Sequence, residues 1–291
     1  MKRILCFLCT LLTVCIFITV LPVIAGEYDD YDDLDDTAVF FKRDKEADVP
    51  VIMYHLVTEK SKYIGKYGIT PAELEADLKF LKDNGYKTVV MGDLINFVQR
   101  GKRLPKKPIV LTFDDGNTGD LNYVLPLLEK YKMKAVFSVI GEAADKFTAQ
   151  REKNPNAKFP NLTWPQIQEM HDSGRCEIQS HGYDLHGRGG SGIRSGESTQ
   201  NYHARLRTDL QKLQTLCHEY LDFTPTTFTY PLGVISKEAQ AVLEEIGFEA
   251  TLSCQEGMNR VKQGDPKCLF RLKRSNRPSG KPIGVLLEAL E

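Results

Sequence analysis

The chain has 291 residues, of which 42% are hydrophobic and 26% are charged, and its net charge at pH 7 is −1. This length is sufficient for one large α/β domain with its own core, and the composition is ordinary for a globular protein. Seven carboxylates between residues 27 and 36 leave the rest mildly basic, but that surplus is too small to indicate nucleic-acid binding, and no DNA- or RNA-binding signature occurs.

The N-terminus has the pattern of an export segment. Lys2 and Arg3 precede an apolar run from Ile4 to Ala25, which ends in the small-residue pattern that a signal peptidase cleaves. The run is also long enough to span a bilayer once. We therefore expect residues 1–25 to be a signal peptide or an N-terminal anchor, and the protein to be secreted or attached to the cell surface or cell wall.

The rest of the chain divides near residue 49. Residues 26–48 are acidic and poor in large apolar side chains, so we expect a disordered linker. The apolar stretch that starts at Val49 opens a folded domain over residues 49–291. The four cysteines of this domain are widely spaced, so one or two disulfides are possible in an exported protein, and a zinc site built from them is not expected.

Helix and strand patterns alternate along this domain. Thr70 and Thr163 begin capping boxes, which predict helices that end at Gly85 and Gly174. Further helices are predicted at 93–100, 123–131, 199–221, 237–246 and 285–290. Strands are predicted at 49–55, 87–91, 108–113, 134–140, 176–179, 226–230, 248–252 and near 269–272. Residues 142–162 are polar with no clear pattern, and residues 187–198 are predicted to be a loop.

The alternation predicts an α/β fold of about seven parallel strands with helices outside them. Such strands form either a doubly wound open sheet or a barrel. No Gly-x-Gly-x-x-Gly follows the first strand, which disfavours a dinucleotide-binding sheet. We therefore expect a barrel, and an irregular one.

The strand at 108–113 ends at two adjacent carboxylates, Asp114 and Asp115. Its apolar run is typical of a fully buried parallel strand, and ligands bind at the carboxyl ends of such strands. Two like charges near an apolar core require a cation or a proton between them. An ordinary strand ending in an Asp-Gly turn explains the same residues equally well, so this motif alone leaves both interpretations open.

Two histidines follow another predicted strand, at His181 and His186. Two imidazoles and one carboxylate form a common set of ligands for a catalytic divalent metal. If the strands share one sheet, their ends lie on one rim, and Asp114 or Asp115 supplies the carboxylate. Taken alone, the histidines are more simply a strand cap and a loop residue. A third strand ends in Tyr230-Pro-Leu-Gly, a turn that can aim a backbone N–H at an oxyanion.

Together these motifs resemble those of a known enzyme family. Thr-Phe-Asp-Asp-Gly at 112–116, Ser-His-Gly-Tyr-Asp-Leu-His at 180–186 and Tyr-Pro-Leu-Gly at 230–233 are similar, in this order, to the NodB-homology polysaccharide deacetylases, carbohydrate esterase family 4. Val-Ile-Met-Tyr-His at 51–55 and Leu-Pro-x-Lys-Pro at 104–108 resemble the Met-Tyr-His-containing branch of that family. The resemblance implies a distorted (β/α) barrel and metal-dependent removal of N- or O-acetyl groups from an acetylated polysaccharide.

The resemblance also implies a role for individual residues. Asp114 corresponds to the general base, and the backbone N–H of Leu232 to the oxyanion donor. The metal, usually zinc, is held by Asp115, His181 and His186. We expect residues at the strand ends to line the substrate groove: His55, Tyr183 and Tyr230. We also expect a monomer that contacts the membrane only through an uncleaved N-terminal segment.

Three departures from the family pattern leave a second interpretation open. Thr229 stands where many members have an arginine that orients the base. The segment 269–274 lacks the histidine that protonates the leaving amine in many members, and Gly182 replaces a usual Ser or Thr. The alternative is therefore a catalytically weakened or inactive glycan-binding protein on the same fold.

Overall fold

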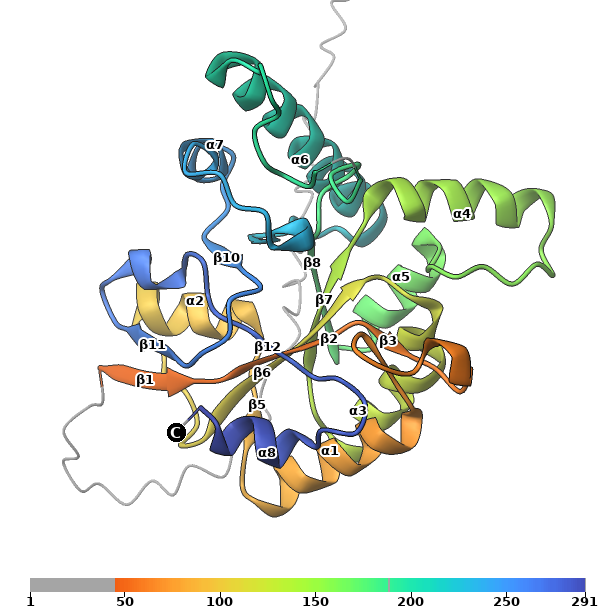
Figure 1. Cartoon of the computed structure of the whole chain (residues 1–291), viewed down its shortest axis with the longest axis vertical. Helices are drawn as coiled ribbons and strands as arrows, with labels where there is room; N and C mark the ends of the chain where they lie inside the picture. The colour runs from red at the N-terminus through yellow and green to blue at the C-terminus, as the bar shows by residue number, and fades with distance from the viewer. Residues whose placement is uncertain (1–44, 188, 291) are drawn as a thin grey trace, which may run out of the picture. The chain divides into compact units, whose positions relative to one another are not determined.

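The computed structural model describes residues 45–187 and 189–290. Seven parallel strands form its main sheet, which curls into a half-barrel with helices around it (Figure 1). Their order is β10 (Ala250–Leu252), β9 (Thr227–Thr229), β8 (Cys176–Ser180), β7 (Ala135–Val139), β6 (Pro108–Asp115), β2 (Val51–Tyr54) and β12 (Ser275–Asn276), and β5 (Lys87–Thr88) pairs with the start of β6. This confirms the predicted distorted (β/α) barrel.

Eight α-helices occur among the described residues. They are α1 (Pro71–Asp83), α2 (Met91–Arg100), α3 (Leu125–Tyr131), α4 (Gly141–Lys153), α5 (Trp164–Asp172), α6 (Thr199–Leu221), α7 (Ala239–Glu245) and α8 (Ile283–Glu288). Both predicted capping boxes are present, Thr70 with Glu73 and Thr163 with Gln166. In α1 the box satisfies the N–H groups of Thr70 and Glu73, and in α5 Gln166 accepts the N–H of Thr163. Helix α6 has the predicted bounds. Among the described residues, no helix combines the length and apolar character that crossing a membrane requires.

The sheet is buried on both faces, as the sequence of β6 predicts. Ile109, Leu111 and Phe113 pack on one side, where Phe113 stacks against Phe137 at 5.1 Å. Val110 packs on the opposite side with the cluster that includes α2. Side chains alternate along a strand, so Asp114 points to the same side as Val110, toward the concave interior of the half-barrel.

Several predicted elements differ from the structure. Residues 141–153 form α4, although we predicted no regular element there, because only Gly141 and Ala144 of this helix are buried and no apolar stripe marks it. The predicted strand at 87–91 ends at Thr88, since Met91 already begins α2. The strand predicted near 269–272 is wrong: the 3₁₀ segment Pro266–Leu269 ends there, and a single bridge joins Leu272 to Leu252.

The folded domain also begins earlier than predicted. Strand β1 (Glu46–Val49) pairs antiparallel with β11 (Asn259–Lys262), a strand that the sequence did not reveal. Glu46 is therefore part of the fold and not of the linker predicted over residues 26–48. The rest of that linker up to residue 44, and the predicted export segment at 1–25, lie outside the described residues. A second small pair joins β3 (Leu56–Val57) to β4 (Gly68–Ile69).

The four cysteines of the domain carry free thiols. Cys176 and Cys217 are buried, Cys268 is partly buried and Cys254 is exposed. The disulfides that the sequence left open do not occur between them in this structure.

Candidate active site

The sheet brings the predicted metal ligands to one rim. Asp115 ends β6 and pairs with Val139, and Val139 pairs with Ser180, the last residue of β8. His181 follows directly, and its N–H donates to the carbonyl of Val139 at 3.0 Å. The Nε2 atoms of His186 and His181 lie 3.1 and 3.6 Å from Asp115 Oδ1. The ligand atoms of the three residues all fall within 4.8 Å of one another.

The hydrogen bonds around these residues fit a bound cation. His181 Nδ1 lies 2.9 Å from the carbonyl oxygen of Thr229. A carbonyl can only accept, so Nδ1 carries the proton and the Nε2 lone pair points at Asp115. Burial lowers the pKa of His181 and favours this neutral form. Asp115 Oδ1 is buried without an aligned hydrogen-bond donor. A carboxylate oxygen that faces an imidazole lone pair matches the donor set of a divalent metal site.

Backbone strain accompanies this arrangement. Asp115 has a φ of 77°, in the left-handed region that residues other than glycine rarely adopt. Strain of this kind is found at functional sites, where the surrounding structure maintains it. Here the Asn161 side-chain amide donates to the Asp115 carbonyl at 3.0 Å and supports the strained position.

Asp114 is held by an arginine that the sequence did not identify. Both Nη atoms of Arg274 donate to the two Asp114 oxygens at 2.8 Å, and Arg274 also bonds Thr112 and the carbonyl of Ser253. The exposed fractions of the Arg274 and Asp114 side chains are 0% and 2%. Although burial opposes ionisation, the charge of Arg274 and its hydrogen bonds hold the pKa of Asp114 at about 2. Asp114 is therefore a fixed carboxylate at neutral pH.

This contact corrects the expected loss of the orienting arginine. Thr229, at the position where many relatives have that arginine, instead bonds Ser138 at 2.7 Å between their hydroxyl oxygens. Arg274 reaches Asp114 from the segment just before β12, which pairs with β2 beside β6. The sequence contains no local signal for this contact, because 160 residues separate the two partners.

A histidine also lies beside Asp114. His55 follows β2, the strand next to β6, and its Nε2 is 4.0 Å from Asp114 Oδ2. Its ring centre lies 4.8 Å from that of Tyr67, and its side chain is 20% exposed. We predicted His55 only as part of the substrate groove. The structure places it next to the predicted base, on the same rim as the predicted metal ligands.

The Tyr-Pro-Leu-Gly motif forms a tight turn at the end of β9. Pro231–Gly233 is one 3₁₀ turn, with Leu232 at a φ of 58° and Gly233 at 67°. A Cβ at position 233 would lie 2.9 Å from the Cys254 side chain, so this position requires glycine. The carbonyl that accepts the hydrogen bond from His181 Nδ1 belongs to Thr229 of β9. The turn therefore directly follows the strand that supports a predicted metal ligand.

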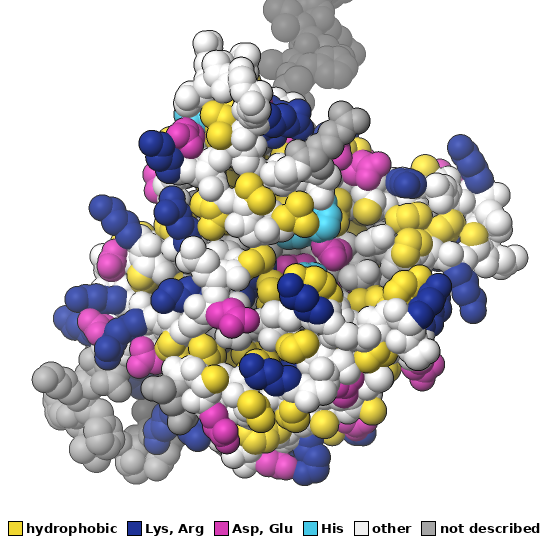
Figure 2. Space-filling model, viewed as in Figure 1, with side chains coloured by type: hydrophobic (Ala, Val, Ile, Leu, Met, Phe, Trp, Pro, Cys, Tyr) yellow, Lys and Arg dark blue, Asp and Glu magenta, His cyan; other side chains and the backbone are white. Residues whose placement is uncertain are grey.

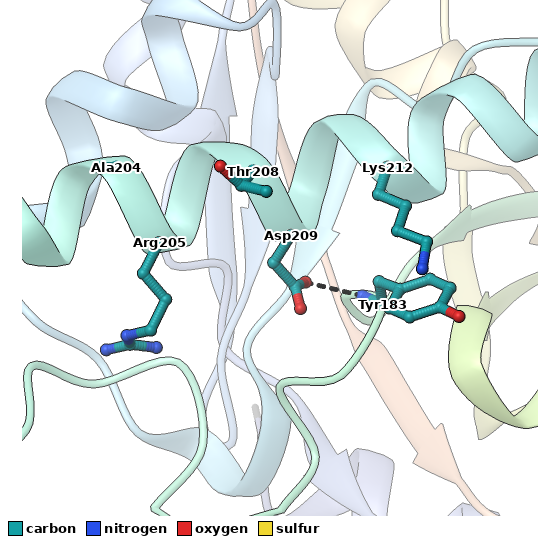
Figure 3. Close-up of a pocket in the computed structure, with 6 residues that line it drawn as sticks. All are labelled: Tyr183, Ala204, Arg205, Thr208, Asp209 and Lys212. Carbon is teal, nitrogen blue, oxygen red and sulfur yellow. Dashed lines mark hydrogen bonds between the residues drawn. The ribbon is translucent and has the colours of Figure 1, made fainter.

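The two tyrosines predicted for the substrate groove have different surroundings. Tyr230 is 1% exposed and packs edge-on against Phe228, so its side chain lies in the core and not in a groove. The Tyr183 hydroxyl donates to Asp145 of α4 at 2.9 Å, and Lys212 Nζ lies 3.4 Å from the centre of its ring. Tyr183 lines a pocket of about 400 Å³ with residues of α6 (Figure 3).

The space-filling view gives the surroundings of the rim. Histidine and acidic atoms gather near the middle of the face shown in Figure 2, and hydrophobic side chains border them. Asp115 and His186 are partly exposed, at 24% and 38% of their side chains. Asp115 and His186 are therefore accessible from solvent, whereas His181, at 3%, and the Asp114–Arg274 pair are buried.

Known proteins share this sequence and fold. The family model for polysaccharide deacetylases matches residues 101–251. "Putative polysaccharide deacetylase YxkH" of Bacillus subtilis is 27% identical, over 88% of this chain and 82% of that protein. The poly-β-1,6-N-acetyl-D-glucosamine N-deacetylase of Escherichia coli K12 is 24% identical over 79% of this chain, but the match spans only 37% of that protein.

Solved structures agree in fold. A de-N-acetylase from Aggregatibacter actinomycetemcomitans superimposes with a TM-score of 0.70 at 25% identity, and covers 83% of this chain and 99% of its own. The Streptococcus pyogenes deacetylase PplD superimposes with a TM-score of 0.68 at 20% identity, and covers 84% and 99%. With the sheet order, the rim residues and the family match taken together, the chain belongs to the polysaccharide deacetylase family.

Proposed function

We propose that this protein is a metal-dependent hydrolase that removes N-acetyl groups, or O-acetyl groups, from an extracellular or cell-wall polysaccharide. The observation that carries the proposal is the position of Asp115, His181 and His186 beside an ionised, arginine-bound Asp114. Relatives from Escherichia coli and Staphylococcus aureus are named as poly-β-1,6-N-acetyl-D-glucosamine N-deacetylases. These names favour a polymer of N-acetylglucosamine as substrate, and the export segment predicted at residues 1–25 is consistent with that location.

The proposed cofactor is a single divalent cation, Zn²⁺. Asp115, His181 and His186 would hold it, a set of two imidazoles and one carboxylate that leaves positions open for water and substrate. When bound there, the cation supplies Lewis-acid polarisation of the acetyl carbonyl and lowers the pKa of a water to about 7. The hydrogen bond from His181 Nδ1 to Thr229 orients one of these ligands.

The residues around the metal site supply the base, the oxyanion donor and the acid. Asp114 accepts the proton of the attacking water, and Arg274 keeps that carboxylate ionised and oriented. The backbone N–H of Leu232 donates to the oxygen that becomes negative as the carbonyl is attacked. His55 donates a proton to the departing nitrogen as the C–N bond breaks, which yields acetate and a free amine on the sugar.

The geometry favours catalysis over the alternative of an inactive glycan-binding protein. That alternative was motivated by a missing arginine and a missing histidine. Arg274 supplies the contact expected of the arginine, and His55 lies 4.0 Å from Asp114, at a position suited to the role of the histidine. A protein that only bound glycan would have no need of a buried ion pair beside the metal ligands, since such pairs carry a large desolvation penalty.

The role of His55 predicts a dependence on the leaving group. His55→Gln is expected to lower the rate of N-deacetylation by about 10²- to 10⁴-fold, the usual range for loss of a general acid. Hydrolysis of p-nitrophenyl acetate should change little, because its phenolate leaves without protonation. Acetate and nitrophenolate release measure the two reactions, with His218→Gln as control because His218 is exposed on α6. An equal loss on both substrates would contradict the role of His55 as the acid.

The substrate class is tested by acetate release from a panel of glycans. Soluble β-1,6-linked N-acetylglucosamine oligomers, peptidoglycan fragments and acetylated xylan are incubated with the purified protein and Zn²⁺. We expect acetate from the N-acetylglucosamine oligomers. Release from acetylated xylan alone would contradict N-deacetylation, and binding of the oligomers without acetate release from any substrate would favour the glycan-binding alternative.

A further inference from the structure

The two histidine ligands depend on an irregular turn for their relative position. His181 is fixed by the sheet, through its N–H bond to Val139 and its ring bond to Thr229. His186 comes five residues later, beyond the last residue of β8 and outside any helix or strand. The turn at 182–185 therefore determines where the His186 ring lies relative to Asp115.

Two helices bind the backbone of this turn. At the start of α4, the N–H groups of Gly141 and Glu142 donate to the carbonyls of Gly182 and Tyr183 at 3.1 and 2.9 Å. From α6, the two oxygens of Asp209 accept the N–H groups of Tyr183 and Asp184 at 2.7 and 2.8 Å. Figure 3 shows the Asp209 carboxylate directed from the helix at the Tyr183 backbone. The backbone groups of the turn are thus fixed from both sides.

The shape of the turn explains its glycine. Gly182 has a φ of 82°, and a Cβ there would lie 2.9 Å from the Leu185 side chain. A side chain at this position would force the turn open and move the residues that follow it. Glycine in place of the usual Ser or Thr therefore matches a compact turn that Asp209 holds closed.

The Asp209 carboxylate accepts hydrogen bonds from backbone N–H groups. No ion pair within 4.0 Å involves it among the described residues, and each of its oxygens accepts one N–H. One turn farther along α6, Lys212 covers the Tyr183 ring, and the Tyr183 hydroxyl is bound by Asp145. Asparagine would offer only one acceptor oxygen and would direct an amide donor at the second N–H.

We propose that Asp209 is a positioning residue for the metal site: its two bonds to the turn hold His186 against Asp115. The inference rests on the metal site proposed above. Asp209 acts through the turn and contacts neither the cation nor the substrate. Groups that orient metal ligands from outside typically change metal affinity by about 10- to 100-fold when they are replaced.

The test compares Asp209→Asn with Glu219→Gln, which makes the same change of charge at an exposed position of the same helix. Zn²⁺ affinity is measured by competition with a chromogenic chelator, and the visible absorption of the Co²⁺-loaded protein reports the ligand geometry. We expect the Zn²⁺ dissociation constant of Asp209→Asn to rise by about 10- to 100-fold, with an altered Co²⁺ spectrum. Glu219→Gln should match the wild type in both.

The outcomes separate this inference from the proposed function. If the wild type itself binds neither Zn²⁺ nor Co²⁺, the proposed metal site is wrong. If the wild type binds both ions and Asp209→Asn has the same affinity and spectrum, the role of Asp209 is overturned. Circular dichroism of the metal-free proteins shows whether the variant is folded. If Asp209→Asn is unfolded, Asp209→Glu is measured in its place, because its longer side chain should displace the turn. A folded Asp209→Glu protein with wild-type Zn²⁺ affinity and Co²⁺ spectrum would also overturn the role of Asp209.

Discussion

Replacing Asp114 with asparagine is expected to reduce deacetylation by about 10²- to 10⁴-fold, the range observed when a general base is removed. An amide oxygen cannot take the proton of the attacking water at neutral pH. The three proposed metal ligands are unchanged, so the variant should still bind one Zn²⁺ per chain. Acetate release and zinc content, measured on the same preparation, check both statements.

The free energy of unfolding of Asp114→Asn is measured alongside its activity. Asp114→Asn leaves Arg274 buried without its counter-charge, and breaking such a pair destabilises a protein by about 3–5 kcal/mol. Activity is therefore compared under conditions where urea unfolding shows that the variant is folded. Asp83→Asn is the matched control, because its ion pair with Lys79 is on the surface. A folded Asp114→Asn protein with wild-type rates would exclude Asp114 as the base.

Arg274→Gln is expected to affect both stability and the pH profile. Removal of the cation leaves the Asp114 carboxylate buried and unpaired, which should lower the free energy of unfolding at neutral pH by about 3–5 kcal/mol. The pKa of Asp114, now about 2, should rise because burial, which opposes ionisation, is then less compensated. The acid limb of the kcat/KM profile should therefore move to higher pH.

The lowered pKa of Asp114 also determines how its contribution to stability depends on pH. In the wild type the pKa of Asp114 lies below its ordinary 3.8, so its ionisation stabilises the fold above that value, and the stabilisation is lost as pH falls toward 2. Arg274→Gln should remove this contribution. Urea unfolding measures the loss of stability, and pH–rate profiles measure the shift of the acid limb. Arg260→Gln is the control, because the ion pairs of Arg260 are exposed and are expected to contribute less than about 1 kcal/mol to stability. An unchanged acid limb would mean that Arg274 does not control Asp114.

Local patterns in the sequence predict much of the fold and the residues that meet at the proposed metal site. Helix α6 and the two capping boxes follow from spacing within a few residues. Parallel strands in one sheet present their carboxyl ends at one edge, and this rule predicts that Asp114 or Asp115 meets His181 and His186. The family resemblance then implies Asp115 as the metal ligand. Both β6 and β8 were predicted as strands, so the residues at their carboxyl ends were expected to meet.

The remaining features depend on contacts between distant parts of the chain. In the sequence, Arg274 resembles any surface arginine, and only the pairing of β12 with β2 brings it under Asp114. The same sheet order places His55 beside that carboxylate. Helix α4 was not predicted because it is almost entirely polar. Its first N–H groups nevertheless bind the turn between the two proposed histidine ligands. No local periodicity encodes these contacts.

The central claim is that one cation, held by Asp115, His181 and His186, makes this chain a deacetylase. The most direct measurement is acetate release from β-1,6-linked N-acetylglucosamine oligomers by metal-free protein during titration with Zn²⁺. We predict no release without metal, full activity at one Zn²⁺ per chain, and no recovery at that ratio for His186→Ala. Wild-type acetate release by the metal-free protein, or full recovery of His186→Ala at one equivalent of Zn²⁺, would contradict the claim.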